Sequence, residues 1–186
     1  KEDKVRLNDA YLRLGDANFV SSQYSKAIKA YEKAIDLNKI DSDYPFFQKA
    51  ISVGYIGQSS KKIKDLEQFI ETYPKSKLRD DAIYELGNSY VKANEKDKAM
   101  QMYSRLGREH KTSPLVSKAL LRQGLVYYND SQNEEALSKF KKVANDYPGT
   151  PEAVQSVATA RLIYIDLGRV DDYAAWVKTL DYVEVT

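Results

Sequence analysis

Residues that favour turns recur at a fixed interval along this chain, and that interval constrains the fold more than any other feature. Gly57, Asn94, Ser131 and Gly168 are each 37 positions apart, and Ser22 precedes Gly57 by 35. A period of this length is typical of repeat proteins, in which each unit is one supersecondary element that stacks on its neighbours. Such arrays usually present extended binding surfaces. The spacing therefore predicts a solenoid fold and a binding role.

Small and large apolar residues keep fixed distances from these turns. Seven positions before each turn stand Gly15, Ala50, Gly87, Gly124 and Arg161. Five positions after it stand Ala27, Lys62, Ala99, Ala136 and Tyr173, and nine after it Tyr31, Leu66, Tyr103, Phe140 and Val177. This spacing is helical. We expect each unit to be an antiparallel helical hairpin in which a Gly or Ala of the first helix faces an Ala of the second. The large residue then fills the gap toward the next unit.

The boundaries of the expected helices follow from the turn residues, prolines and acidic first turns. The predicted helices are 4–20, 24–38, 44–56, 60–73, 79–93, 97–109, 115–129, 133–146, 151–167 and 170–181. The predicted fold is all-α, an α-solenoid of about five stacked hairpins in a right-handed superhelix. We expect residues 1–186 to form a single array with units near 4–40, 43–77, 79–112, 115–149 and 151–182.

Composition excludes several classes of protein. The chain has 29 basic and 27 acidic residues, a net charge of +2, and no cysteine. This balance disfavours a nucleic-acid-binding protein, which concentrates basic residues on one face. Without cysteine, disulfides and thiolate metal sites are impossible. The sequence contains no run of 18 apolar residues, so it does not predict a membrane-spanning helix. Because the chain starts at Lys1 rather than Met, we expect it to be a fragment of a longer protein.

The sequence offers no arrangement of residues for catalysis. His110 is the only histidine, so histidine metal clusters and histidine-assisted nucleophiles have no support. Gly-rich phosphate loops and the common hydrolase motifs are also missing. Paired acidic residues occur at expected helix starts, where the helix dipole explains them. We predict a protein that is not an enzyme and has no cofactor and no metal.

The motif of the first unit resembles the tetratricopeptide repeat (TPR) family. Unit one carries Tyr11, Leu14-Gly15, Tyr24, Ala27, Tyr31 and Ala34 at the family's positions, and unit four carries Gly124, Tyr127, Ala136, Phe140 and Pro148. Unit two departs from the motif at Lys62 and Phe69, and unit five at Arg161 and Tyr173. The resemblance covers nearly the whole chain, and it implies a protein- or peptide-binding scaffold.

One linker is similar to those of bacterial cell-envelope TPR proteins. The segment Tyr73-Pro74-Lys-Ser76 and the 37-residue period resemble the Tol–Pal-associated periplasmic protein and the outer-membrane assembly lipoproteins. This resemblance implies a periplasmic or cell-envelope location. The residues themselves leave a cytoplasmic location open.

The family resemblance also implies which residues meet a ligand, since TPR ligands usually contact fixed positions of the first helix in each unit. The predicted groove set comprises Tyr44, Phe47, Ile51, Tyr55, Tyr84, Asn88, Lys92, Lys118, Leu121, Arg122, Leu125 and Tyr128. Tyrosine and aliphatic residues with a few charges are typical of a peptide-binding surface. The alternative is that some of them pack against adjacent helices or a neighbouring copy.

One TPR subclass binds C-terminal carboxylates with two Lys, two Asn and one Arg. Lys118 and Arg122 match the third unit of that clamp. Its other positions hold Phe47, Ile51 and Glu85, and the glutamate would repel a carboxylate. The sequence therefore argues against such a clamp, although Lys118 and Arg122 could still contact an acidic peptide.

The last predicted helix is unusually apolar for the end of an array. Its expected packing face consists of Tyr173, Trp176, Val177 and Leu180. Terminal repeats normally carry a polar outer face. We expect this face to pack against further repeats of the parent chain or against another copy.

Two classes of function remain after these exclusions. The leading prediction is a non-catalytic scaffold that binds a protein or peptide in the concave groove. The alternative is a structural spacer or oligomerisation module within a larger cell-envelope protein, in which the terminal helix carries the important contacts. RNA binding is disfavoured by the small net charge.

Overall fold

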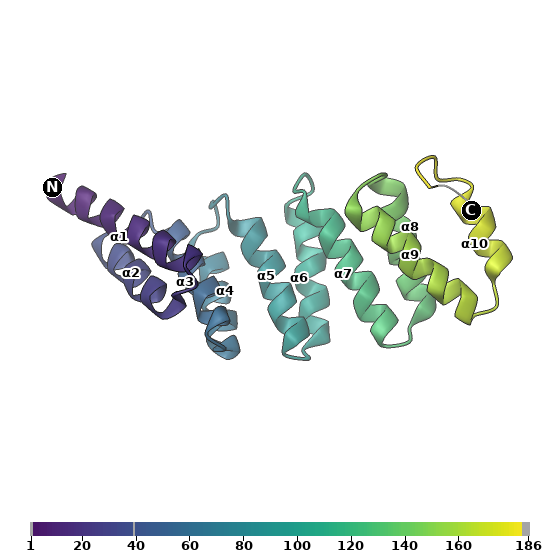
Figure 1. Cartoon of the computed structure of the whole chain (residues 1–186), viewed down its shortest axis with the longest axis horizontal. Helices are drawn as coiled ribbons and strands as arrows, with labels where there is room; N and C mark the ends of the chain where they lie inside the picture. Colours follow the sequence, from purple (N-terminus) through teal and green to yellow (C-terminus); the bar gives the residue numbers. More distant parts are fainter. Residues whose placement is uncertain (1, 39, 184–186) are drawn as a thin grey trace. The chain divides into compact units, whose positions relative to one another are not determined.

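The structure is a computed structural model that describes residues 2–38 and 40–183 (Figure 1). Within those residues there are ten α-helices and no strand, which confirms the all-α class. The helices are α1 (Glu2–Val20), α2 (Tyr24–Leu37), α3 (Asp43–Tyr55), α4 (Ser59–Thr72), α5 (Arg79–Lys92), α6 (Lys96–Glu109), α7 (Leu115–Asn129), α8 (Asn133–Asp146), α9 (Pro151–Asp166) and α10 (Val170–Val177).

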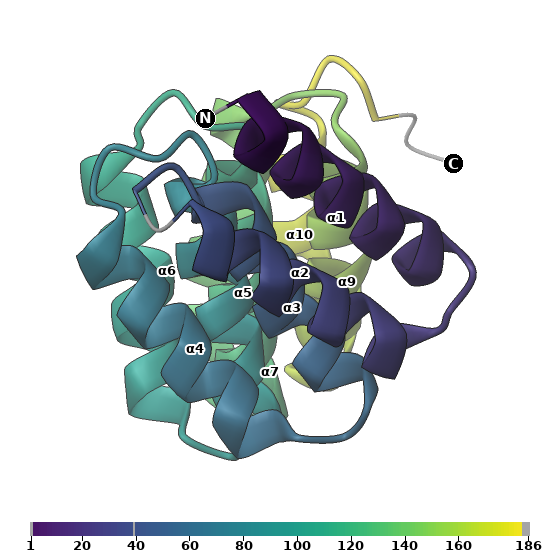
Figure 2. The same ribbon diagram turned by 90° about the vertical axis from the view of Figure 1, so that its left-hand side faces the viewer.

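The chain divides into two compact units, Lys1–Ala99 and Met100–Thr186, and the division falls within α6. In the first unit α1 pairs with α2, α3 packs on both, α4 pairs with α3, and α5 packs on α4. Figures 1 and 2 show α1 and α2 lying side by side as an antiparallel pair. In the second unit α7 pairs with α8, α9 packs on both, and α10 packs on α9. Each unit thus repeats the helical hairpin that the periodicity predicts.

The residues that mark the repeat all adopt the left-handed backbone conformation. Their φ angles are 58° for Ser22, 81° for Gly57, 60° for Asn94, 58° for Ser131 and 67° for Gly168. At each of these turns the next residue donates its N–H to the carbonyl five positions back, as Gln23 does to Asn18 at 2.8 Å. This is the Schellman ending of a helix, which needs a left-handed residue. The 37-residue period therefore marks the turn within each hairpin.

The small residues of the repeat make room for an aromatic ring. A Cβ placed on Gly15 would lie 2.4 Å from the Tyr31 ring, and one on Gly124 would lie 2.5 Å from the Phe140 ring. The nearest neighbour of each glycine is thus an aromatic ring of the second helix, where the sequence predicted an Ala. The large residue nine positions after the turn covers the glycine of its own hairpin. Phe140 also belongs to the cluster that contains α9 residues of the next unit, as the prediction has it.

The last helix ends earlier than the sequence predicts, at Val177 instead of residue 181. A turn follows, in which the Leu180 N–H bonds to the Val177 carbonyl. The Tyr182 hydroxyl then donates to the Ala144 carbonyl of α8 at 2.8 Å. Leu180 is buried with Ala144, Val157 and Val177. Packing of this segment against α8 and α9 explains why the helix stops.

Candidate functional site

The predicted groove residues of α3 are divided between packing and exposure. Phe47 packs on the ring of Phe69 at a centroid distance of 5.7 Å, and Ile51 is half-buried. Tyr55 stacks on Tyr24 at 4.5 Å and is 61% exposed. Tyr44 is also exposed. Of the four residues predicted here, Tyr44 and Tyr55 keep surface that a ligand can reach.

Tyr44 shares a carboxylate with the first hairpin. The hydroxyls of Tyr31 and Tyr44 each donate to Asp16 Oδ1 at 2.8 Å. Burial, followed by the hydrogen bond to Asp16, raises the pKa of both tyrosines above the ordinary value of 10.0. Both rings therefore stay neutral donors at physiological pH, and they tie α3 to the first hairpin.

The predicted residues of α5 surround an ion pair between two hairpins. Lys62 Nζ of α4 lies 2.8 Å from Glu85 Oε2 of α5, with side-chain exposures of 15% and 32%. Asn88 donates to the other oxygen of Glu85 at 3.4 Å. Tyr84 is half-buried and Lys92 is exposed. Glu85 thus holds a neighbouring lysine, which accounts for an acidic residue at a position where a carboxylate clamp needs Asn.

The predicted residues of α7 fall on two faces of the helix. Lys118 and Arg122 are exposed. Leu121 is buried, and Leu125 and Tyr128 pack against the cluster that contains Ala160, Ile163 and Tyr164. Leu121, Leu125 and Tyr128 therefore contribute to the packing of α7 with α8 and α9. Sequence position in the repeat did not distinguish ligand-facing residues from these packing residues.

The predicted terminal face points into its own unit. Val177 and Leu180 are 2% and 7% exposed, and Tyr173 and Trp176 pack against the same clusters. The apolar side chains exposed at this end belong mainly to α9 and the turn after it. Contact of the terminal helix with a missing neighbour stays a prediction.

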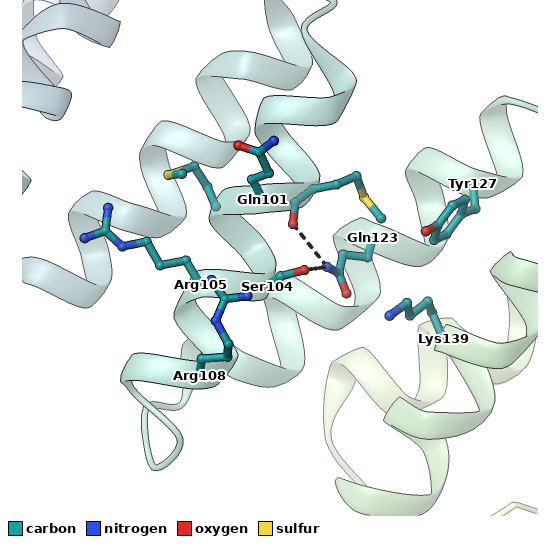
Figure 3. Close-up of a pocket in the computed structure, with 9 residues that line it drawn as sticks. Gln101, Ser104, Arg105, Arg108, Gln123, Tyr127 and Lys139 are labelled. Atoms are coloured by element: carbon teal, nitrogen blue, oxygen red, sulfur yellow. Dashed lines mark hydrogen bonds between the residues drawn. The ribbon is translucent and has the colours of Figure 1, made fainter.

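A basic hollow, which sequence reasoning missed, lies in the second unit between α6, α7 and α8 (Figure 3). Its volume is about 510 Å³. The residues that line it are Met100, Gln101, Met102, Ser104, Arg105, Arg108, Gln123, Tyr127 and Lys139. No sequence motif predicts this site, because its side chains come from three helices, at positions where the repeat has no fixed residue type. Single charges on a well-mixed surface give no sequence signal for it.

A buried glutamine forms the floor of the basic hollow. Gln123 is 3% exposed, and its Nε2 donates to Ser104 Oγ at 2.8 Å and to the Met100 carbonyl at 3.4 Å. Arg108 lies on one side of Gln123 and Lys139 on the other (Figure 3). Because Gln123 is fixed by two hydrogen bonds to α6, it holds α6 and α7 at a defined separation.

Two of the three cations of the hollow have no ion-pair partner among residues 2–38 and 40–183, namely Arg108 and Lys139. The third, Arg105, bonds Glu109 through its Nε at 2.8 Å. Cations beside methionine side chains and an aromatic ring suit a ligand that combines carboxylates with apolar groups.

The described part of the chain holds no group of three or more His, Cys, Asp or Glu residues that could bind a metal ion. None of its helices is both long and apolar enough to cross a membrane.

Stacked helical hairpins with left-handed turns and glycine–aromatic contacts define a helical-repeat protein. Models of the tetratricopeptide repeat family match residues 8–41, 81–113 and 118–150, which together make up more than half of the chain. The chain therefore belongs to the tetratricopeptide repeat family. No curated protein sequence matches it.

Solved structures of TPR proteins share this fold. A MamA protein aligns with a TM-score of 0.73 at 19% identity, covering 97% of this chain and 98% of that one. A putative kinesin light chain from Podosopora anserina aligns with a TM-score of 0.69 at 15% identity, covering 97% and 95%. YrrB, a TPR protein with an unusual peptide-binding site, gives 0.64 at 16% identity, covering 91% and 82%. At these identities the likeness concerns the fold alone.

Proposed function

We propose that this chain is a non-catalytic scaffold that binds a peptide segment carrying acidic and apolar side chains. Proteins of the tetratricopeptide repeat family typically act as scaffolds for protein interaction. YrrB, which has a similar fold, offers a precedent for peptide binding. The basic hollow of the second unit is the observation that carries the acidic preference.

The size and chemistry of the hollow support a peptide ligand. Its volume of about 510 Å³ lies within the range of small-molecule and side-chain pockets, roughly 300–1,000 Å³. Arg108 and Lys139 can each form a charge-assisted hydrogen bond with a carboxylate. Met100, Met102 and Tyr127 supply adaptable apolar contact beside them. A segment in which an acidic residue adjoins an apolar one satisfies both parts of the site.

Fluorescence anisotropy can test the acidic preference. The probe is a labelled peptide of alternating Glu and Leu residues. The comparison peptide carries Gln in place of every Glu. We expect the Glu peptide to bind more tightly, and the double variant Arg108→Glu with Lys139→Glu to raise its Kd at least about tenfold. Lys33→Glu, an exposed charge reversal on α2, serves as the matched control. Equal binding of the Gln peptide, or unchanged affinity in the double variant, would refute the proposal.

The concave groove remains a second proposed surface for the same scaffold role. The observation that favours it is that first helices of each unit keep exposed side chains at the ligand positions of the repeat: Tyr44, Tyr55 and Lys92 in the first unit and Lys118 in the second. Lys118→Glu with Lys92→Glu separates this surface from the basic hollow. Loss of peptide binding in that variant, with normal binding in the Arg108 and Lys139 variant, would assign the peptide to the groove. A cell-envelope location, suggested by the Tyr73-Pro74 linker, is part of the proposal.

A further inference from the structure

Alignment of the repeats shows which face of the first helix in a hairpin is covered by the first helix of the next hairpin. On α7 the covered positions are Leu121, which belongs to a buried cluster that includes residues of α8 and α9, and Leu125 and Tyr128, which pack against that cluster. We call these three positions the front face. Adding 37 places the front face of α9 at Ala158, Leu162 and Ile165.

The front face of α9 is uncovered. Leu162 is 52% exposed and Ile165 is 50% exposed. Next to them lies a hollow of about 560 Å³, whose lining includes Val154, Ala158 and Tyr173. Apolar side chains thus line a site whose counterpart on α7 receives a helix. Within the described residues of the second unit, nothing covers Leu162 or Ile165 to the extent that α9 covers Leu121.

The opposite face of α9, which packs against α7 and α8, has its own counterpart on α1. We call it the back face, and on α9 it includes Ala153, Val157 and Ala160, which are at most 5% exposed. The same register places the back face of α1 at Leu7, Tyr11 and Leu14.

In the described part of the first unit, the back face of α1 is exposed as well. Leu7 is 46% exposed and Leu14 is 50% exposed. The residue at the register of Leu14 on α5, Leu86, is 2% exposed. Likewise Phe46 on α3, at the register of Tyr11, is 8% exposed. The α1 back face therefore carries apolar residues where internal helices bury theirs.

We propose that the back face of α1 from a second copy of this chain packs on the front face of α9. The occupant follows from the register, because one chain displays both halves of its own internal interface. Inside the second unit, Leu125 and Ala160 belong to one packed cluster. Their counterparts across the new contact are Leu162 and Leu14. The contact is heterologous, so it adds copies head to tail and is separate from the proposed peptide site.

Cysteine cross-linking tests this geometry cleanly because the chain contains no cysteine. Leu14→Cys and Leu162→Cys are prepared as separate variants of the full chain, mixed, and oxidised. We expect a disulfide-linked pair that joins one copy of each variant. Each variant oxidised alone should give much less linked product. Efficient linkage of either variant to itself, or none in the mixture, would overturn the proposal.

Mass measurement by light scattering provides an independent test. The unaltered chain should show an average mass that rises with concentration above the 21.2 kDa of one copy. Leu162→Glu and Leu14→Glu should each raise the dissociation constant at least about tenfold, because each places a charge in an apolar contact. Val20→Glu is the matched control, since Val20 is 83% exposed. The residues at the same repeat position in α7 and α9, Asn129 and Asp166, are also exposed, so this position lies outside the contact.

Other occupants of the α9 face give distinct results. A mass of one copy at all concentrations, together with slow reaction of Leu162→Cys with a thiol reagent, would place another part of the same polypeptide there. Assemblies that persist unchanged in Leu162→Glu would place the contact elsewhere. Either result would overturn the proposal. Circular dichroism of the exposed-site variants checks that they fold.

Discussion

Gly124 is the position where the packing of a hairpin can be tested most sharply. A Cβ there would lie 2.5, 2.8 and 3.1 Å from three atoms of the Phe140 ring. Phe140 is fully buried and belongs to the cluster that joins α7, α8 and α9. The ring cannot move away without displacing that cluster. We therefore expect Gly124→Ala to overpack the hairpin at a cost of about 1–3 kcal/mol.

Gly107 supplies the matched control for this substitution. It lies in α6 of the same unit, and a Cβ there would meet nothing within 4 Å. Gly107→Ala should stabilise the unit by about 0.5–1 kcal/mol, because Ala favours a helix over Gly. Both variants gain that propensity. The difference between the two free energies of unfolding, about 1–3 kcal/mol, then measures the overpacking alone.

Urea unfolding followed by tryptophan fluorescence gives that difference. Trp176 is the only tryptophan and lies in the same unit as both glycines. Phe140→Leu should restore much of the loss in Gly124→Ala, since it removes the ring atoms that the new methyl group meets. If Gly124→Ala proved as stable as Gly107→Ala, the assignment of this glycine to aromatic packing would be refuted.

Three further predictions concern a turn, an ion pair and a titrating group. Ser131→Gly should stabilise the chain by up to about 1 kcal/mol, because it relieves the left-handed conformation, and thermal unfolding checks this. Glu85→Ala should lower the free energy of unfolding in urea by about 1–2 kcal/mol, because it leaves the more buried Lys62 unpaired. Lys62→Met should lower it by less, and equal losses in the two variants would contradict this. Burial and the hydrogen bond to Asp16 raise the pKa of Tyr31, so the folded chain keeps a proton that the unfolded chain loses near pH 10. The stabilisation from Tyr31 is complete below that pH and is lost as the pH rises toward the pKa of the folded chain. Between about pH 8 and pH 11, the free energy of unfolding measured in urea should therefore fall less in Tyr31→Phe than in the unaltered chain.

The sequence predicted the repeat well because the turn chemistry is local. A left-handed residue is needed at each turn, and Ser22, Asn94 and Ser131 reveal it in the same register as Gly57 and Gly168. Hairpin helices follow from that spacing and from the apolar stripe between turns. Only the last helix was misplaced, because its end depends on packing of Tyr182 against α8.

Contacts between helices were harder to predict than the helices themselves. The period shows that Gly124, Ala136 and Phe140 recur, but it does not show which of them meet. In the same way, Leu125 and Lys118 both occupy ligand positions of the repeat, yet only Leu125 packs against the α9 cluster. The rotation of each helix about its own axis decides which residues meet and which stay exposed, and a single sequence does not specify that rotation.

The basic hollow could not be predicted from the motif. Arg108 and Lys139 lie on different second helices, and Gln123 lies on the helix between them. Their proximity depends on the way α6, α7 and α8 pack. Single charges on a well-mixed surface give no sign of this convergence.

Methionine methyl NMR tests the proposed binding function most directly. The chain has two methionines, Met100 and Met102, and both line the basic hollow. With 13C-labelled methionine methyl groups, both signals should shift when the Glu–Leu peptide is added, and neither should shift with the Gln peptide. The shifts should disappear in the variant with Arg108→Glu and Lys139→Glu. Binding of the Glu–Leu peptide with both methyl signals unmoved would contradict the account.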